Sequence, residues 1–235
     1  MKPDVILTWP RNCDYPLWRK MIAKNRDNFD DIFVVFMNPN QGVDYRDFVI
    51  SEMQDTDVIF IDSPEIQPGQ DWRDVAVNEA LLMSGSDWIW FTEQDFIPRV
   101  KFFQFHKIAT TPEDIRVVAA YAGDRMHPCS IWIKRAALDE TSKYFGIDTK
   151  RGKFDHFGQL QVDLEKNEKR IAHLPSVYYR HMNGLSHNWT LVSQGQPPVY
   201  KPKLFTKYIK QCLNSHMELH PEFRRIATDY VQGLH

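Results

Sequence analysis

Residues 72–98, WRDVAVNEALLMSGSDWIWFTEQDFIP, decide the fold of this chain. Their first half spaces alanine, valine and leucine as one face of a helix does, and Gly85 marks where that helix ends. The run at 87–92, DWIWFT, predicts a buried strand, and the triplet Glu93-Gln94-Asp95 follows its carboxyl end. A helix that leads into a buried strand is the repeating unit of α/β proteins, which bind ligands where their parallel strands end. We therefore expect the triplet to lie at a functional site.

Strand and helix patterns alternate on both sides of this stretch. Further strands are predicted at 4–8, 31–37, 58–61, 117–121, 130–133 and 171–179, and further helices at 135–144, 157–167 and 203–216. The alternation predicts an α/β fold with a mostly parallel sheet and helices on both faces. The proline-rich segment 194–202, QGQPPVYKP, is typical of a linker. We expect one domain at 1–193 and a C-terminal helical extension, 194–235, packed on it.

Composition excludes several classes of protein. The chain has 235 residues, of which 43% are hydrophobic and 26% charged, as in globular domains and unlike collagens, coiled coils or disordered tails. Its three cysteines cannot all pair within the chain, and their spacing is not that of a zinc knuckle, which favours a reducing compartment. The apolar run before Pro10 is too short for a signal peptide or a membrane span. We expect a cytoplasmic protein without membrane contact.

Positive charge gathers in the C-terminal region, although the net charge is only −2. No aspartate or glutamate occurs at 169–217, and the helix predicted at 203–216 has a basic face. This favours a surface that binds anions, with a solvated face that merely lacks acids as the open alternative. The basic side chains of the segment are Lys169, Arg170, Arg180, Lys201, Lys203, Lys207 and Lys210.

The carboxylate of Asp95 suits a hard divalent cation. Such a cation prefers oxygen ligands and keeps water or phosphate oxygens in its remaining positions, so it can neutralise a diphosphate. The open alternative is an ordinary polar turn after a strand.

At this point residues 72–98 resemble the nucleotide-sugar-dependent glycosyltransferases of the GT-A fold, in which a strand ends in Asp-any-Asp after a helix that bears Arg or Asn. The resemblance implies a GT-A (Rossmann-like) fold, a divalent metal (Mn²⁺ or Mg²⁺) and a nucleotide-diphosphate sugar as donor. It places Arg73 and Asn78 at the donor and Asp95 on the metal. Glu93 stands where the family has its first Asp, and is expected near the ribose or the metal.

The resemblance continues after residue 129, where the order of motifs matches the family. These motifs are IKRAAL at 133–138, Phe154-Asp155, Val162-Asp163-Leu164, Leu174-Pro175 and Arg180-His181. It implies that His181 is a metal ligand opposite Asp95, with His187 as the runner-up.

One departure from the family leaves the identity of the general base undecided. Inverting members have an acidic pair where this chain has Leu160-Gln161, and glutamine cannot accept a proton. Either Asp163 or Asp155 deprotonates the acceptor, or the enzyme retains the anomeric configuration and Gln161 positions the transition state.

The loop at 8–12, TWPRN, follows the first strand, where the family holds the nucleotide. The resemblance places Thr8 in this loop, Trp9 in a stack on the base and Arg11 on the diphosphate. Asp62, after the third strand, is expected to contact the base or ribose.

The acceptor is suggested by two runs, TWPRNCDYPLWR at 8–19 and YYRHMNGLSHN at 178–188. They resemble small phage-type (TET/JBP-associated) glycosyltransferases proposed to modify hydroxymethylated pyrimidines, such as hydroxymethylcytosine, in DNA. The resemblance implies that DNA, in a bacteriophage-infected cell, is the acceptor and that the basic region 169–217 contacts it. Lysines interleaved with aromatic residues at 200–210 are consistent with this, because cations can track phosphates and aromatic rings can receive an extruded base.

Three alternatives stay open. One is a glycosyltransferase for a glycan or small molecule, and another is a catalytically silent nucleic-acid-binding module. The third is a nucleotidyltransferase, which normally needs a glycine-rich loop that TWPRNCDYPL lacks.

Overall fold

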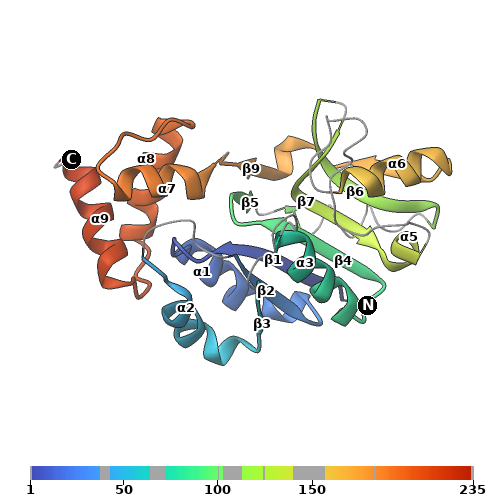
Figure 1. Ribbon diagram of the computed structural model, residues 1–235, viewed down its shortest axis with the longest axis horizontal. Helices are drawn as coiled ribbons and strands as arrows, with labels where there is room; N and C mark the ends of the chain where they lie inside the picture. Colours follow the sequence, from blue (N-terminus) through green and yellow to red (C-terminus); the bar gives the residue numbers. More distant parts are fainter. Residues whose placement is uncertain are drawn as a thin grey trace.

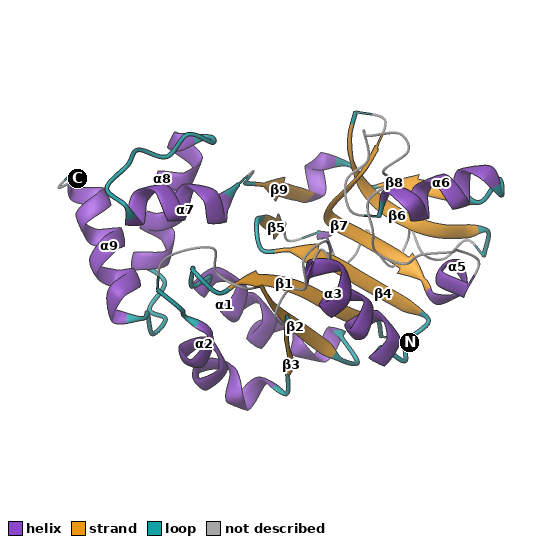
Figure 2. Ribbon diagram, viewed as in Figure 1, coloured by secondary structure: helices purple, strands orange, loops and turns teal. Residues whose placement is uncertain are grey.

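The computed structural model describes residues 2–37, 43–63, 72–99, 101–102, 113–123, 125–139, 157–182 and 184–233, with the backbone alone at 72–74. Figures 1 and 2 show the elements and their arrangement. The strands are β1 (Asp4–Pro10), β2 (Ile32–Met37), β3 (Ile59–Asp62), β4 (Trp88–Glu93), β5 (Phe96–Pro98), β6 (Ile115–Ala122), β7 (Arg125–Lys134), β8 (Arg170–His173) and β9 (Tyr179–His181). The helices are α1 (Pro16–Asn25), α2 (Arg46–Met53), α3 (Trp72–Met83), α5 (Arg135–Asp139), α6 (Gly158–Lys166), α7 (Leu185–Ser193), α8 (Pro202–Leu213) and α9 (Pro221–Gln232).

Seven strands form one sheet in the order β3-β2-β1-β4-β7-β6-β8. Neighbouring strands are parallel except on either side of β7, which runs antiparallel to both β4 and β6. Every residue of β2 is buried, as expected for a parallel strand that helices cover on both faces. The predicted α/β fold with a mostly parallel sheet is therefore confirmed.

The two faces of the sheet pack into two separate apolar cores. Along β1, Val5 and Leu7 face one core and Ile6 faces the other, because successive side chains of a strand point to opposite faces. Apolar residues of α1, α2, α7, α8 and α9 complete the first core. Those of α3, α5 and α6 complete the second.

The C-terminal helices lie beside α1 and α2, beyond the left end of the sheet in Figure 1. The buried guanidinium of Arg19 pairs with the buried Asp14 at 2.9 Å and donates to the carbonyl of Glu218 at 2.5 Å. Trp189 of α7 stacks on Phe223 of α9, with 4.3 Å between ring centroids. The amphipathic helix predicted at 203–216 is α8, whose apolar side Phe205, Tyr208, Ile209 and Cys212 is buried.

One predicted strand is shorter than expected. The run at 171–179 contains β8 and then leaves the sheet, because Pro175 has no N–H to donate to a neighbouring strand. After a short turn the chain forms β9, which pairs antiparallel with β5 and aligns Phe96 with His181. This two-stranded ribbon brings the segment after β4 next to residues 179–181.

Candidate active site

The turn between β4 and β5 is fixed by contacts to Gln94. The indole N–H of Trp18 donates to the carbonyl of Gln94 at 2.7 Å, and the hydroxyl of Thr8 lies 3.5 Å from its side-chain oxygen. Thr8 is also aligned with Glu93 across the parallel pair β1 and β4. The triplet at 93–95 therefore lies at the carboxyl end of β4, as the sequence predicts, beside the neighbouring strand β1.

Asp95 is a buried carboxylate whose two oxygens differ. The residue is 6% exposed. Oδ2 lies 3.1 Å from Nε2 of His181 and accepts the backbone N–H of Gly184 at 3.1 Å. Oδ1 is buried and has no hydrogen-bond partner among the described residues. A buried carboxylate oxygen is normally satisfied, so an unpartnered one indicates a place for a cation or a donor group.

Glu93, Asp95 and His181 come together at this point, with one ligand atom from each within 4.8 Å of the others. Two carboxylates and an imidazole suit a divalent ion such as Mn²⁺ or Mg²⁺. The structure thus brings together Asp95 and His181, the leading candidates for metal ligands, and places Glu93, which is expected near the ribose or the metal, beside them.

Gly184, whose N–H donates to Asp95, borders this site and packs against Tyr200. Gly184 has φ of +67°, and a Cβ there would lie 2.9 Å from Cδ2 of Tyr200, so the position requires glycine. The side chain of Asn188 holds the backbone of Tyr200, accepting its N–H at 3.0 Å and donating to its carbonyl at 2.6 Å. Lys201, the next residue, donates to the carbonyl of His181 at 3.0 Å.

His187, the runner-up as a metal ligand, is not part of this group of ligand atoms. Its ring packs edge-on against Tyr200, with 5.3 Å between centroids. Among the described residues, the groups that offer three ligand atoms contain His181 and not His187.

His127 is a residue that the sequence analysis missed. It lies on β7, its ring packs against that of His181 at 4.6 Å, and its Nδ1 accepts the backbone N–H of Cys129 at 3.1 Å. Ligand atoms of His127, Cys129 and His181 also lie within 4.8 Å of one another. The available signal was a histidine and a cysteine two residues apart in the chain.

Some of the residues predicted to bind the donor are already paired with other side chains. Arg11 forms an ion pair with Asp44, and Asp62 accepts two hydrogen bonds from Arg46 at 2.7 and 2.6 Å. Burial would raise the pKa of Asp44, but hydrogen bonds from Arg11 and from the backbone of Arg46 outweigh it and hold that pKa below its usual range. Thr8 is buried, Asn78 is half-buried on α3, and the side chain of Arg73 lies outside the described residues.

The prediction that Trp9 stacks on a nucleotide base is wrong. Its indole is 0% exposed, donates to the carbonyl of Cys13 at 3.1 Å and packs edge-on against Tyr15. The side chain of Trp9 points into the core because it follows the same alternation as Val5 and Leu7.

The candidate bases lie on or before α6. Gln161 is 1% exposed, accepts the backbone N–H of Met126 at 2.7 Å and donates to Glu165 at 2.7 Å. Both ends of this amide are thus engaged, the oxygen with β7 and the NH2 group within α6. Asp163 is half-buried and accepts from Gln159 at 2.8 Å, whereas Asp155 lies outside the described residues.

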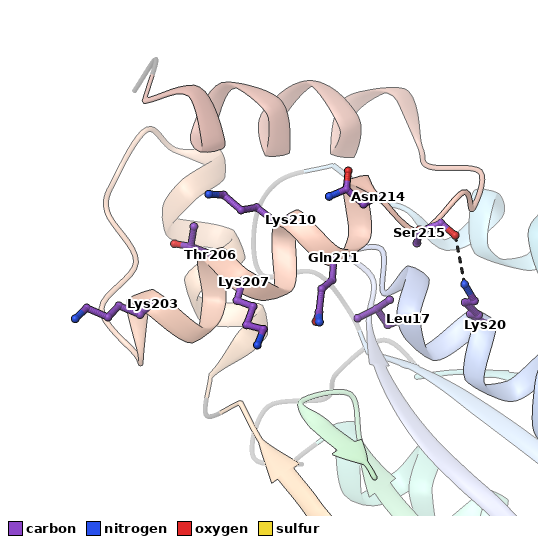
Figure 3. A pocket seen from close by; sticks show the side chains of 9 residues that line it. All are labelled: Leu17, Lys20, Lys203, Thr206, Lys207, Lys210, Gln211, Asn214 and Ser215. Atoms are coloured by element: carbon purple, nitrogen blue, oxygen red, sulfur yellow. Dashed lines mark hydrogen bonds between the residues drawn. The ribbon is translucent and has the colours of Figure 1, made fainter. Parts of the chain in front are cut away.

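A groove between α1 and α8 carries much of the predicted basic surface (Figure 3). Its volume is about 630 Å³, and the residues described along it include four lysines and no acid. Lys20 comes from α1, while three lysines project from α8. The lining is Leu17, Lys20, Lys203, Thr206, Lys207, Lys210, Gln211, Asn214 and Ser215.

Within the described part of the chain, the helices are too short or too polar to span a lipid bilayer.

Comparisons with known proteins show similarity at the level of structure. No protein-family model and no curated protein matches the sequence. Glucosyl-3-phosphoglycerate synthase from Mycobacterium tuberculosis, in complex with Mn²⁺ and uridine-diphosphate-glucose, superposes with a TM-score of 0.54. The two sequences are 16% identical, and the match covers 77% of this chain and 71% of the synthase.

A mannosyltransferase from Pyrobaculum calidifontis, in complex with GDP-Man and Mn²⁺, also has a TM-score of 0.54. It is 13% identical, and the match covers 98% of this chain and 70% of the mannosyltransferase. At such low identity the likeness establishes the fold alone, which is the GT-A fold.

Proposed function

We propose that this protein is a metal-dependent glycosyltransferase that moves a hexose or pentose from a nucleotide-diphosphate sugar to a hydroxyl acceptor. The observation that carries the proposal is the buried, unpartnered Oδ1 of Asp95 beside His181 and Glu93. The bound donors and Mn²⁺ named for the two similar structures support it, because their fold is shared by this chain.

The reaction exchanges two bonds at the anomeric carbon. The bond from that carbon to the diphosphate oxygen breaks, the acceptor oxygen bonds to the carbon, and the acceptor proton passes to a base. Glu93, Asp95 and His181 would hold a divalent cation, which when bound would offset the charge that develops on the diphosphate. The predicted base is Asp163 or Asp155. Because both ends of the Gln161 amide are engaged, the observed geometry favours a carboxylate over Gln161 at the acceptor.

Thermal unfolding with nucleoside diphosphates tests the proposal. UDP and GDP are each added with and without Mn²⁺, and a ligand at 100 times its Kd stabilises a protein by about 2.7 kcal/mol. For a chain of this size that corresponds to a rise in Tm of roughly 5–10 °C. We expect the rise to require Mn²⁺ and to be absent in Asp95→Asn, while His187→Ala keeps it. A rise that is equal with and without Mn²⁺ would contradict the metal site.

We further propose that the acceptor is a hydroxymethylated pyrimidine in DNA, modified in the cytoplasm of a phage-infected cell. The groove along α8 favours this acceptor class because its described lining has four lysines and no acid. Lys203, Lys207 and Lys210 are spaced as neighbours on one helix face, over a rise of roughly 10 Å. The helix also starts beside the candidate metal site, since Lys201 donates to the carbonyl of His181.

The decisive experiment supplies DNA that contains hydroxymethylcytosine or hydroxymethyluracil, together with a panel of nucleotide sugars. Mass spectrometry should show the gain of one sugar per modified base and no gain on unmodified DNA. Transfer to a glycan or small molecule, with none to modified DNA, would contradict this acceptor and leave the glycosyltransferase proposal intact.

The role of the groove is tested by removing its charge. In the triple variant Lys203→Ala, Lys207→Ala, Lys210→Ala, the slope of log K for DNA against log salt should become shallower by as much as about 2.7. The matched control removes Lys2, Lys101 and Lys166, which are exposed and lie outside the groove. An equal effect of both variants would assign DNA binding to net charge rather than to the groove.

A further inference from the structure

His181 belongs to two sets of candidate ligands, not one. Glu93 and Asp95 approach it from the end of β4, and His127 and Cys129 approach it from β7. Within each set the ligand atoms lie within 4.8 Å of one another. The site thus has an oxygen-rich side and a nitrogen- and sulfur-rich side that share one imidazole.

The two sides differ in the metal they prefer. Carboxylate oxygens favour Mg²⁺ and Mn²⁺, whereas imidazole and thiolate ligands favour Zn²⁺ and other thiophilic ions. His127 and Cys129 are two residues apart on β7, at an irregularity in its pairing with β6, and their ligand atoms lie within 4.8 Å of each other. Nδ1 of His127 accepts the N–H of Cys129, which means that this nitrogen presents a lone pair rather than a proton on the side of the cysteine.

We propose that His127, Cys129 and His181 form a second metal site, for Zn²⁺ or a similar thiophilic ion, which excludes the Mn²⁺ or Mg²⁺ site at Glu93, Asp95 and His181. The proposed exclusion is competition for the imidazole of His181, which belongs to both sets of ligands. Binding of Zn²⁺ releases the thiol proton of Cys129 to solvent, displaces the weak N–H contact at His127 Nδ1 and involves no change of oxidation state. Zinc would then inhibit sugar transfer, a consequence that rests on the proposed function.

The sulfur of Cys129 can report metal binding at the second site. Cys129 is almost fully buried in an apolar core, where an uncoordinated thiolate is disfavoured. An ultraviolet thiolate-to-metal charge-transfer band on addition of Cd²⁺ would therefore report coordination by Cys129. Cys13 and Cys212 are buried elsewhere and serve as internal controls.

The experiment titrates the full-length protein with Cd²⁺ alone. We expect one thiolate band per chain in the wild type and in Glu93→Gln, no band in Cys129→Ser, and at least tenfold weaker binding in His127→Asn. Cys13→Ser should keep the band. Circular dichroism melts of each variant show that the protein is folded.

Competition tests the exclusion without any measurement of transfer. Free Mn²⁺ is followed by electron paramagnetic resonance while Zn²⁺ is added to the Mn²⁺-loaded protein. Zinc should release Mn²⁺ from the wild type at about one equivalent, and Cys129→Ser should need at least tenfold more.

Two results overturn the second site: a Cd²⁺ band that survives Cys129→Ser, or the absence of a band in the folded wild type. If the band is present but zinc leaves Mn²⁺ in place, the exclusion is wrong. None of these results depends on whether the protein transfers sugars, so failure of the proposed function is recognised separately.

Discussion

Two buried carboxylates stand at opposite ends of the central strands, and only one of them is satisfied. Asp4, the first residue of β1, is 1% exposed, and Asp95, after β4, is 6% exposed. Oδ2 of Asp4 accepts from the hydroxyl of Ser84 at 2.6 Å and from the N–H groups of Gly85 and Ser86 at 3.0 and 3.1 Å. Oδ1 of Asp4 accepts from the N–H of Asp31 at 3.0 Å and the hydroxyl of Ser86 at 2.8 Å.

The comparison separates a structural carboxylate from a functional one. Asp4 binds the turn between α3 and β4 to the start of β1, so its hydrogen bonds hold the sheet together. Asp95 leaves Oδ1 unpartnered, and such a group is tolerated where a ligand completes it. Burial and position at a strand end are therefore common to both residues, and the count of hydrogen bonds distinguishes them.

The largest expected effect is that of Asp95→Ala on the rate of sugar transfer. Because the carboxylate is proposed to hold the cation that offsets charge on the diphosphate, the rate should fall at least about 1,000-fold, equivalent to roughly 4 kcal/mol. Stability should fall by only about 1–2 kcal/mol, because the N–H of Gly184 and the ring of His181 lose their contact with Oδ2, whereas Oδ1 contributes no hydrogen bond within the described residues. Initial rates and denaturant unfolding measure both quantities, and a folded variant with a wild-type rate would remove Asp95 from the mechanism.

Asp4→Ala should have the opposite profile. It leaves buried N–H and hydroxyl donors without their acceptor, which we expect to destabilise the fold by about 3 kcal/mol. The corresponding fall in Tm is roughly 6–12 °C for a chain of this size. Mn²⁺-dependent binding of a nucleoside diphosphate, measured while the variant is still folded, should be unchanged. Equal stability of the variant and wild type would contradict the structural role.

The two histidines predicted as metal ligands give the next comparison. His181→Ala should weaken Mn²⁺ binding about 10- to 100-fold because it removes a proposed ligand that contacts Oδ2 at 3.1 Å. His187→Ala removes only a ring packed on Tyr200 and should change Mn²⁺ affinity less than threefold. Isothermal titration of the pair decides between them, and the reverse ranking would move the ligand to His187.

The smallest effect is on the stability of the wild type in acid. Burial would raise the pKa of Asp4, but the hydroxyls of Ser84 and Ser86 and the N–H groups of Asp31 and Ser86 outweigh it and lower that pKa from 3.8. A carboxyl with a lowered pKa in the folded state stabilises the fold above its unfolded pKa, and loses this contribution as the pH falls through the folded value. The free energy of unfolding should therefore decline below about pH 4 more steeply in the wild type than in Asp4→Asn. Parallel curves would show that Asp4 makes no such contribution.

The sequence was sufficient for the central strands and for the pairing of Asp95 with His181. Continuous apolar runs predict buried strands, and the order of motifs in the GT-A resemblance set His181 opposite Asp95. The prediction for Trp9 is wrong because β1 continues to Pro10, beyond the strand predicted at 4–8, and its alternation turns the indole into the core. His127 was missed because the predicted strand began at residue 130, whereas β7 begins at Arg125.

Other features depend on contacts between distant segments. Gln161 looked like a catalytic side chain, but its partner Met126 lies 35 residues away, so only the fold shows that its amide is engaged. The groove required α1 to meet α8, nearly two hundred residues apart in the chain. Charge patterning predicts the three lysines on α8 but not Lys20 on the facing helix α1.

The most direct test of the central claim is Mn²⁺ binding to the wild type, Asp95→Asn and Asp4→Asn, followed by electron paramagnetic resonance. All three are measured at a temperature at which each is folded. The wild type and Asp4→Asn should bind one Mn²⁺ per chain with affinities within threefold, and Asp95→Asn should bind at least 100-fold more weakly. Unchanged binding in Asp95→Asn, or equal loss in both folded variants, would contradict the assignment of the unpartnered carboxylate to the metal.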